Sequence, residues 1–454
     1  MLLPSGAMLL SVLLAADEPE PRPGAAPSAA PSLATSSRVE RTQESLAPAE
    51  TLEALVGARV EVRSGRPGST VEGYSLTQIE VDPLIGVSGP IRSTRITAVY
   101  DPRIILVADE SPSQGGRTVA YLHRGRLVLD AVPSARTRFF INGLFAYGNN
   151  DFLPLTSALT PTTITGQPPT EPGSTPVAPV PTPGTSRLPD QRFLTVVDLD
   201  ASAGIVNSVS PRLEWRASAG YRYAGGADAE ARASLPLQKG PKGSLGIAWS
   251  GSERDTWTSL LDAFDARFSS GPHSTIANLS LSWAHSWTRE LGTDLVGGVT
   301  GFHSVVPDQG AVPGRVENSI RPLGGVGLRY ALLGRHTFWR TSVSVLCAPL
   351  PDPITGLVVQ RVGGVAGTAL SPTTGLTFEV TGGGAASLDG TQQDGRVEAR
   401  IIYQPVAEIS ISIGGRMAWL GGPSESLLGP SGFGWLAFAT VSASLGNLPA
   451  GGWP

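Results

Sequence analysis

Cysteine and long apolar runs are scarce in this chain of 454 residues, and each shortage excludes a class of protein. The single cysteine, Cys347, excludes an internal disulfide framework and a zinc site built from cysteines. We expect it to be a small apolar residue within a strand. No stretch of about 18 consecutive apolar residues occurs, whereas a helix needs about 20 to cross a bilayer. The sequence therefore excludes helical membrane spans.

Lysine and catalytic constellations are also scarce. Lys239 and Lys242 are the only lysines among 34 basic residues, which we attribute to genome composition. The net charge is −4, so no basic excess favours nucleic acid. No two of the five histidines are spaced as metal ligands on one element, and no Gly-x-Ser-x-Gly motif joins a strand to a helix. We predict no enzymatic activity, no metal ion, no cofactor and no nucleic-acid partner.

Apolar and polar side chains alternate with a period of two over residues 211–237. Successive side chains of a strand face opposite sides of a sheet, so this pattern predicts an antiparallel hairpin that turns at 224–226. One face carries alanines with aromatic residues near the ends. That composition suits lipid, because acyl chains fill the space that a packed core would fill with larger side chains. On this interpretation Ala229 faces lipid, where arginine would cost about 2–4 kcal/mol of stability.

The same alternation recurs along the chain, at residues 278–287, 396–403, 409–413 and 433–445. Strands of about ten residues with an apolar face, a polar face and aromatic ends are typical of outer-membrane barrels. The sequence therefore predicts an all-β fold, a transmembrane antiparallel β-barrel of about 16–18 strands.

The N-terminal part has a different composition from the proposed barrel. Residues 1–16 contain a short apolar run followed by small residues, which predicts a signal peptide. Residues 17–50 are rich in proline, alanine and serine and are predicted to be disordered. Residues 51–92 contain short strand-like runs that could form a periplasmic hairpin, a first barrel strand or a plug. We place the barrel at residues 93–446.

Short and long connections alternate between the proposed strands. The short ones are predicted at 101–103, 133–136, 210–212, 240–242, 334–336, 371–373 and 404–405. The longer ones are predicted at 148–191, 251–272, 305–315, 349–356, 388–395 and 421–431. Barrels of this class have short periplasmic turns and longer extracellular loops. We expect that the connection 148–191 can be shortened without loss of folding.

Two sets of candidate functional side chains follow from the alternation. The candidates for lining the pore, which carry charges of both signs, are Glu214, Arg216, Arg222, Asp228, Glu230, Arg232, Asp294, Arg329, Glu379, Arg396, Glu398, Arg400 and Arg416. They could set the chemical preference of a pore or only form a salt-bridged wall. The candidates for the lipid interface are Trp215, Tyr221, Trp249, Trp283, Trp287, Trp419 and Trp435.

Three stretches of the chain resemble a known family. Residues 100–103, 145–152 and 208–215 are similar to turn segments of myxobacterial integral outer-membrane β-barrels. The resemblance covers residues 93–446 and rests on the style of the turns. Some members of that family are porins of polysaccharide secretion that act with periplasmic export proteins.

The resemblance implies an outer-membrane channel that secretes a polysaccharide. Its partners would be outer-membrane lipids, the polysaccharide and a periplasmic export protein, and the chain would reach a Gram-negative outer membrane after export through the inner membrane. Three alternatives stay open at this stage. The chain could be a general solute porin or uptake channel, a secreted β-rich adhesin or carbohydrate-binding protein, or, least favoured, a barrel enzyme.

Overall fold

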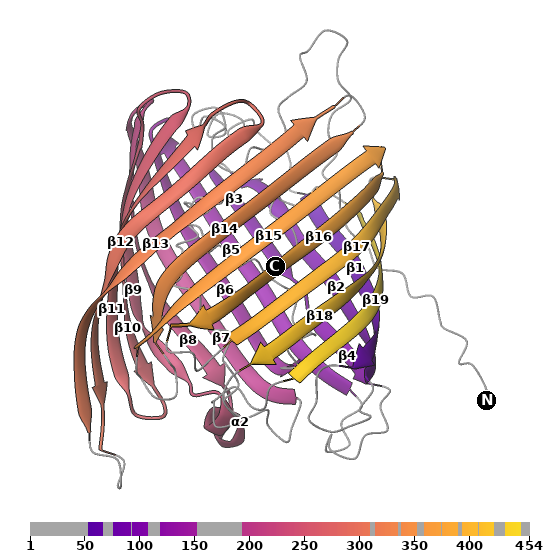
Figure 1. Ribbon diagram of the computed structural model, residues 1–454, viewed down its shortest axis with the longest axis horizontal. Helices are drawn as coiled ribbons and strands as arrows, with labels where there is room; N and C mark the ends of the chain where they lie inside the picture. Colours follow the sequence, from indigo (N-terminus) through magenta and orange to yellow (C-terminus); the bar gives the residue numbers. More distant parts are fainter. Residues whose placement is uncertain are drawn as a thin grey trace.

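The structure is a computed structural model of the full chain, and strands dominate the part that it describes (Figure 1). The described residues are 53–66, 76–91, 93–107, 119–151, 193–308, 314–334, 337–351, 358–373, 375–388, 393–406, 408–421 and 432–445. The predicted signal peptide, the segment 17–50 and most of the connection 148–191 lie outside the described residues.

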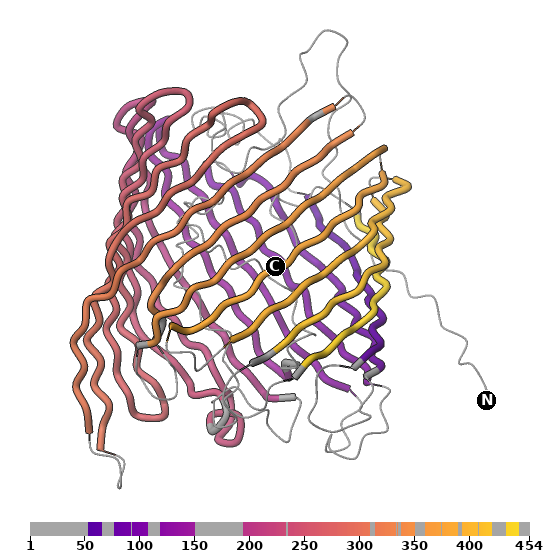
Figure 2. Tube along the Cα trace, viewed as in Figure 1, coloured from indigo at the N-terminus to yellow at the C-terminus, as the bar shows by residue number. Residues whose placement is uncertain are grey.

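The strands form one closed antiparallel sheet. β1 (Glu53–Arg66) pairs with β2 (Leu76–Ile91) on one side and with β19 (Gly432–Leu445) on the other, so the first and last strands close the wall. Figure 2 shows indigo β1 beside yellow β19, and Figure 1 shows tilted front strands crossing tilted rear strands. The strands between β2 and β19 are β3 (Thr94–Tyr100), β4 (Arg103–Val107), β5 (Val119–Ser134), β6 (Thr137–Asp151), β7 (Phe193–Ser210), β8 (Leu213–Gly226), β9 (Gln238–Ser250), β10 (Asp255–Phe268), β11 (His273–Ser286), β12 (Leu291–Val306), β13 (Arg315–Leu333), β14 (Phe338–Pro351), β15 (Val358–Thr373), β16 (Leu376–Ser387), β17 (Gln393–Val406) and β18 (Ile409–Gly421).

β3 and β4 lie end to end in one position of the wall, because each pairs with β2 on one side and with β5 on the other. The tight hairpin predicted at 101–103 is therefore wrong. Pro102 cannot donate a ladder hydrogen bond and interrupts the strand without reversing it, while Asp101 N still donates to Arg124 O on β5 (3.1 Å). Within the described residues the wall has 18 strand positions, which confirms the predicted transmembrane barrel.

The two faces of the wall differ in chemistry. On β1, Glu61 and Arg63 are buried, whereas Val56 and Val62 on the other face are 49 % and 38 % exposed. The apolar face continues with exposed Ile85 on β2. A charged face directed at lipid would lack hydrogen-bonding partners, so the face with the buried charges is the inner one and the apolar face is the outer one.

Residues 227–235, predicted as the second strand of a hairpin, form instead a short helix, α2 (Ala229–Ser234), between β8 and β9. The carboxylate of Asp228 caps this helix by accepting a hydrogen bond from Ala231 N (2.7 Å). Alanine, glutamate and arginine favour helices, and the alternation of alanine with polar residues does not distinguish a strand from an alanine-rich turn of helix. Ala229 therefore does not lie on the lipid face of a strand.

Four predicted connections lie within strands. Residues 371–373 and 404–405 belong to the ends of β15 and β17, so the turns after these strands begin later than predicted. Residues 240–242 belong to β9, which runs unbroken from Gln238 to Ser250, so the predicted turn is wrong. The long connection predicted at 251–272 is also wrong, because residues 255–268 form β10. β10 has an unusual composition for this wall, since Leu260 and Phe268 are buried on its inner face while Asp265 and Arg267 lie on its outer face.

Short turns and long connections occupy opposite rims. The short-turn rim holds the connections between β2 and β3, β5 and β6, β7 and β8, β9 and β10, and the corresponding later pairs, and β1 starts and β19 ends there. The other rim carries the longer connections and α2, which lies at the lower edge of Figure 1, together with one short turn at residues 269–272 between β10 and β11. Residues 53–66 and 76–91 lie in the wall as β1 and β2, so the wall begins upstream of residue 93.

Candidate functional site

A cluster of opposite charges lies on the inner face where the ends of the sheet meet. We call it the seam cluster, and its members are Arg59, Glu61 and Arg63 on β1, Glu80 and Asp82 on β2, Asp101 and Arg103 beside and on β4, and Arg124 on β5. The carboxylates of Glu61, Glu80 and Asp82 are 2 %, 1 % and 0 % exposed. The seam cluster is therefore a buried part of the wall.

Three of the four carboxylates of the seam cluster, Glu61, Glu80 and Asp82, are each paired with more than one arginine, and Asp101 is paired with Arg124. Glu80 Oε2 lies 2.8 Å from Arg63 Nη2, and its Oε1 lies 3.0 Å from Arg103 Nε. Asp82 lies 3.5 Å from both Arg59 and Arg103. Buried charges are tolerated when they are paired on several sides, so alternating signs let this face carry ions at low exposure.

The charged face continues across the closure of the barrel. The hydroxyl of Thr440 on β19 donates a hydrogen bond to Glu61 Oε2 on β1 (3.2 Å). On β18, Arg416 Nε lies 2.7 Å from Glu398 Oε2 on β17, and the guanidinium carbon of Arg416 lies 5.1 Å from the centre of the Phe438 ring. Ion pairs thus lie on the inner face on both sides of β19, which joins them through the hydroxyl of Thr440 and the ring of Phe438.

Further ion pairs lie elsewhere on the inner face. Arg222 on β8 lies 3.2 Å from Asp198 and 3.5 Å from Asp200 on β7, and Lys242 on β9 also contacts Asp200. Arg329 on β13 lies 3.8 Å from Asp294 on β12.

Glu379 on β16 is shared by two arginines. It lies 2.5 Å from Arg400 on β17 and 3.2 Å from Arg340 on β14. Both arginines are substantially exposed, so the inner surface here presents cationic groups that are not enclosed.

Most of the predicted pore-lining residues lie on this charged inner face. The residues that the strand register places on the inner face are Glu214, Arg216, Arg222, Asp294, Arg329, Glu379, Arg396, Glu398, Arg400 and Arg416. That they line the conducting path stays a prediction.

Three predicted pore-lining residues do not lie on a strand. Asp228 is the N-cap of α2, Glu230 lies in its first turn and Arg232 in its last turn. Arg232 donates to the carbonyl oxygens of Gly226 (3.0 Å) and Ala227 (2.9 Å), so its guanidinium anchors the helix to the end of β8.

The sequence pattern does not predict the seam cluster, for two reasons. It leaves residues 51–92 open between a periplasmic hairpin, a first barrel strand and a plug, and it predicts a turn at residues 101–103. The signal was nevertheless present, because Val60 and Val62 alternate with Glu61, just as Ile79 and Val81 alternate with Glu80. Alternation over so few residues does not by itself distinguish a barrel strand from an isolated hairpin.

The predicted interface aromatics sit on the outer face near the ends of strands, apart from Trp287 in the turn after β11. Trp215, Trp249 and Trp283 lie toward the short-turn rim, and Trp419 and Trp435 lie toward the opposite rim. Their contact with lipid headgroups stays a prediction.

Near the short-turn rim the aromatic residues form a connected group. The rings of Trp257 and Trp283 stack with centroids 5.8 Å apart, and His285 and Trp287 follow at 4.4 Å from each other. Asp255 accepts hydrogen bonds from Trp283 Nε1 (3.0 Å) and from His285 Nδ1 (2.7 Å).

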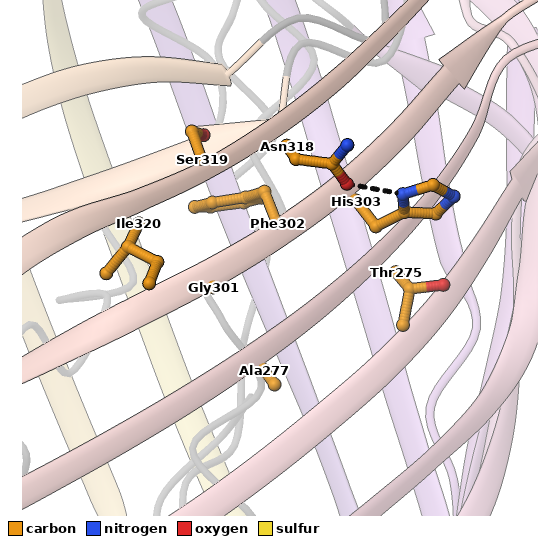
Figure 3. A pocket seen from close by; sticks show the side chains of 8 residues that line it. All are labelled: Thr275, Ala277, Gly301, Phe302, His303, Asn318, Ser319 and Ile320. Atoms are coloured by element: carbon orange, nitrogen blue, oxygen red, sulfur yellow. Dashed lines mark hydrogen bonds between the residues drawn. The ribbon is translucent and has the colours of Figure 1, made fainter.

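A shallow pocket of about 480 Å³ lies over β11, β12 and β13 (Figure 3). It includes Ala277, Gly301 and Ile320, and His303 Nδ1 lies 2.7 Å from Asn318 Oδ1 at its edge. Thr275 in this lining is the register partner of His303, but its hydroxyl donates a hydrogen bond to Asp265 Oδ1 (2.7 Å).

The described residues contain no group of three or more histidine, cysteine, aspartate or glutamate side chains that could hold a metal ion. Within the same residues, no helix has the length and apolar character needed to cross a membrane. Cys347 lies on β14, and Gln360 Nε2 lies 3.0 Å from its sulfur.

The chain is similar to solved structures of outer-membrane proteins. The outer membrane protein OpdK from Pseudomonas aeruginosa is 10 % identical with a TM-score of 0.41, over 87 % of this chain and 99 % of that chain. OpdQ from the same organism is 9 % identical with a TM-score of 0.46, over 87 % and 98 %. OccAB4 from Acinetobacter baumannii is 8 % identical with a TM-score of 0.44, over 87 % and 98 %.

Comparison with curated proteins finds no match. Comparison with protein families finds a match. The sequence profile of the EpsX exopolysaccharide export family matches residues 49–425, which is most of the chain and includes the seam cluster, and the chain therefore belongs to that family.

Proposed function

We propose that the barrel is an outer-membrane channel through which an exopolysaccharide leaves the cell, moving along the charged inner face. The observation that carries the proposal is the closed 18-position wall with an apolar exterior and an ion-paired interior, in a chain of an exopolysaccharide export family. A closed sheet leaves no unpaired edge in lipid, and barrels of this size enclose a lumen.

The charge pattern suits a polymer of sugars. Arginine and carboxylate groups offer hydrogen-bond donors and acceptors to the hydroxyl groups of sugars. Because these side chains pair with each other, the wall does not bind a charged group of the polymer too tightly for it to move on. Passage through such a lumen requires no catalytic group.

The remaining parts of the proposal rest on the family resemblance and, for the export signal, on the composition of residues 1–16. A periplasmic polysaccharide export protein delivers the polymer, and the chain reaches the outer membrane through the inner membrane with residues 1–16 as its signal. Origin from a myxobacterium stays a prediction.

Narrowing the lumen tests the proposal. The three inner serines Ser218, Ser244 and Ser282 are replaced together by tryptophan in a strain that carries this chain as its only copy. The matched control replaces their outward neighbours Ala217, Leu245 and Leu281 by tryptophan, on the same three strands. We expect the inner set to lower both surface exopolysaccharide and single-channel conductance, and the outer set to leave both near wild type.

Heat-modifiable gel mobility of membrane fractions confirms that both variants form barrels. Unchanged surface polymer in the inner variant, combined with lower uptake of small solutes, would contradict export and favour a general solute porin.

A further inference from the structure

One turn design is repeated at the short-turn rim, between β5 and β6, between β7 and β8, and between β9 and β10. The repeated sequence is Ser-x-Arg-x-x-aromatic, as Ser134-Ala135-Arg136-Thr137-Arg138-Phe139, Ser210-Pro211-Arg212-Leu213-Glu214-Trp215 and Ser252-Glu253-Arg254-Asp255-Thr256-Trp257. Three successive hairpins along one rim therefore carry an arginine at the same place.

The main chain of each arginine is held on both sides. The serine hydroxyl accepts from the arginine N–H, at 3.3 Å for Arg136, 3.3 Å for Arg212 and 3.1 Å for Arg254. The arginine carbonyl accepts from the neighbouring strand at 2.8, 2.8 and 2.9 Å, from Ser208, Ser250 and Ser286. These hydrogen bonds fix the main chain of each arginine, so the three side chains start from defined positions on the rim.

The side chains of these three arginines are exposed. In the part of the chain that the structure describes, none of their guanidinium groups has an ion pair or a hydrogen bond. They differ in this from the inner-face arginines Arg63, Arg222 and Arg416, which lie within reach of carboxylates. An exposed cation at the same place in three turns, with no ion pair of its own in the described residues, points to an anionic partner even though Glu253 and Asp255 flank Arg254 in the sequence.

The aromatic residue of each repeat identifies the environment of that partner. Phe139, Trp215 and Trp257 lie on the outer, apolar face of the wall, where aromatic rings mark the level of lipid headgroups. Each arginine stands three residues nearer the rim, which is about 7 Å along the barrel axis for a strand tilted by about 40°. The arginine and the ring are an odd number of residues apart, so their Cβ atoms lie on opposite faces of the ladder. From its place in the turn at the rim, an extended arginine side chain is nevertheless long enough to turn outward to the phosphate level beyond the ring.

Distance also favours lipid over a polymer in the lumen. For a barrel of 18 strand positions, strand spacing and tilt give a radius of about 18 Å, so a chain on the axis lies well beyond a Debye length from the rim. Headgroups of the surrounding leaflet touch the wall itself.

We propose that Arg136, Arg212 and Arg254 form a binding row for the phosphate groups of anionic phospholipids in the leaflet next to the short turns, which is the periplasmic leaflet. The turns are separated by two strand spacings, about 10–13 Å along the rim, so each arginine serves its own lipid. The row fixes the depth and tilt of the barrel in the membrane. This inference requires the barrel in a bilayer and does not depend on its cargo.

Photolabelling of the full chain in vesicles tests the proposal. The probes are photoreactive phosphatidylglycerol and photoreactive phosphatidylcholine, and mass spectrometry measures labelling of peptides that contain residues 134–139, 210–215 and 252–257. We expect phosphatidylglycerol to label these turns more strongly than phosphatidylcholine. In the triple variant R136Q/R212Q/R254Q this preference falls about fivefold at each turn at low salt.

Two controls keep the outcome interpretable. The variant R136K/R212K/R254K keeps the charge and should keep the preference. The variant K239Q/R267Q removes two basic residues from the outer face near the opposite rim, where Lys239 and Arg267 are in register, and should leave labelling of the three turns unchanged.

An equal preference in wild type and in the glutamine variant would overturn the proposal. So would binding of a soluble acidic protein or an acidic polysaccharide that is lost in the glutamine variant while lipid labelling stays the same. The assay uses no export substrate, so a negative result here would leave the proposed export function standing.

Discussion

Thr440 on the last strand donates a hydrogen bond of 3.2 Å to Glu61 on the first strand, although the two residues are 379 positions apart in the chain. Both side chains are buried on the inner face. The bond therefore couples closure of the wall to the seam cluster, because it forms only when β1 and β19 are paired.

Removing the Thr440 hydroxyl should weaken closure of the barrel. T440V keeps the shape of the side chain but deprives a buried carboxylate of a donor, which costs about 1–3 kcal/mol. We expect the folded form in heat-modifiable gels to unfold at lower temperature. T440S keeps the hydroxyl and should behave almost as wild type, and equal melting of both variants would contradict the assignment.

Glu80 should be among the most sensitive positions of the inner face. E80Q removes the charge that Arg63 and Arg103 share while leaving both guanidinium groups buried, and breaking buried pairs of this kind costs about 3–5 kcal/mol. Urea unfolding in detergent micelles measures the change.

The matched control for Glu80 is Glu317 on β13, which also faces inward. Its partner Arg321 lies 3.6 Å away and has a side chain that is 43 % exposed, so solvent screens the pair. E317Q should cost at most about 1 kcal/mol. A loss as large as that of E80Q would show that burial does not control the strength of these pairs.

The assignment of faces can be tested on a single strand. Leu245 and Ser244 are neighbours in β9, with Leu245 on the outer face and Ser244 bonded to Ser218 on the inner face (2.8 Å). L245R should cost about 2–4 kcal/mol because it places arginine against lipid, and S244R should cost much less. Folding yield into vesicles and urea unfolding measure both.

Substitution of Ala229 provides a third variant for comparison with L245R and S244R. It lies exposed at the start of α2, so A229R should leave stability near wild type. A loss of stability in A229R as large as that in L245R would contradict the helix. It would indicate instead that residue 229 lies on a lipid-facing strand, as the alternation predicts.

Gly148 should not tolerate a side chain. Its φ is +137°, and an added Cβ would lie 2.1 Å from the carbonyl oxygen of Tyr121 on β5. G148A should destabilise the barrel by about 1–3 kcal/mol. G143A is the control on the same strand, because a Cβ there has no heavy atom nearer than 3.9 Å, and thermal unfolding compares the two.

Alternation predicted the strands best where apolar and polar faces were cleanly separated. On β11, Leu279 and Leu281 face outward while Asn278 faces inward, as the sequence pattern indicated. On this strand the apolar side chains face lipid and the polar side chains face the lumen, so the sequence pattern and the structure agree.

Alternation gave a wrong prediction where the polarity of a side chain does not match the face of the wall on which it lies. The pattern does not predict β10, because Leu260 and Phe268 are on its inner face and Asp265 is on its outer face, which reverses the usual polarity at these positions. In the segment 227–235 the alanines suit both a lipid-facing strand and a helix, whereas the helix formers Glu230 and Arg232 and the cap at Asp228 favour the helix.

The period of the strands, the identity of their apolar face and several of the turns could be predicted from the chain alone, because each depends on residues close together in the sequence. The pairing of β1 with β19, and the sharing of one wall position by β3 and β4, could be seen only in the folded barrel. Strand pairing satisfies backbone groups without regard to side-chain identity, so no local pattern specifies which strands pair. The seam cluster therefore arises from closure of the ring, which joins residues whose separation along the chain carries no local signal.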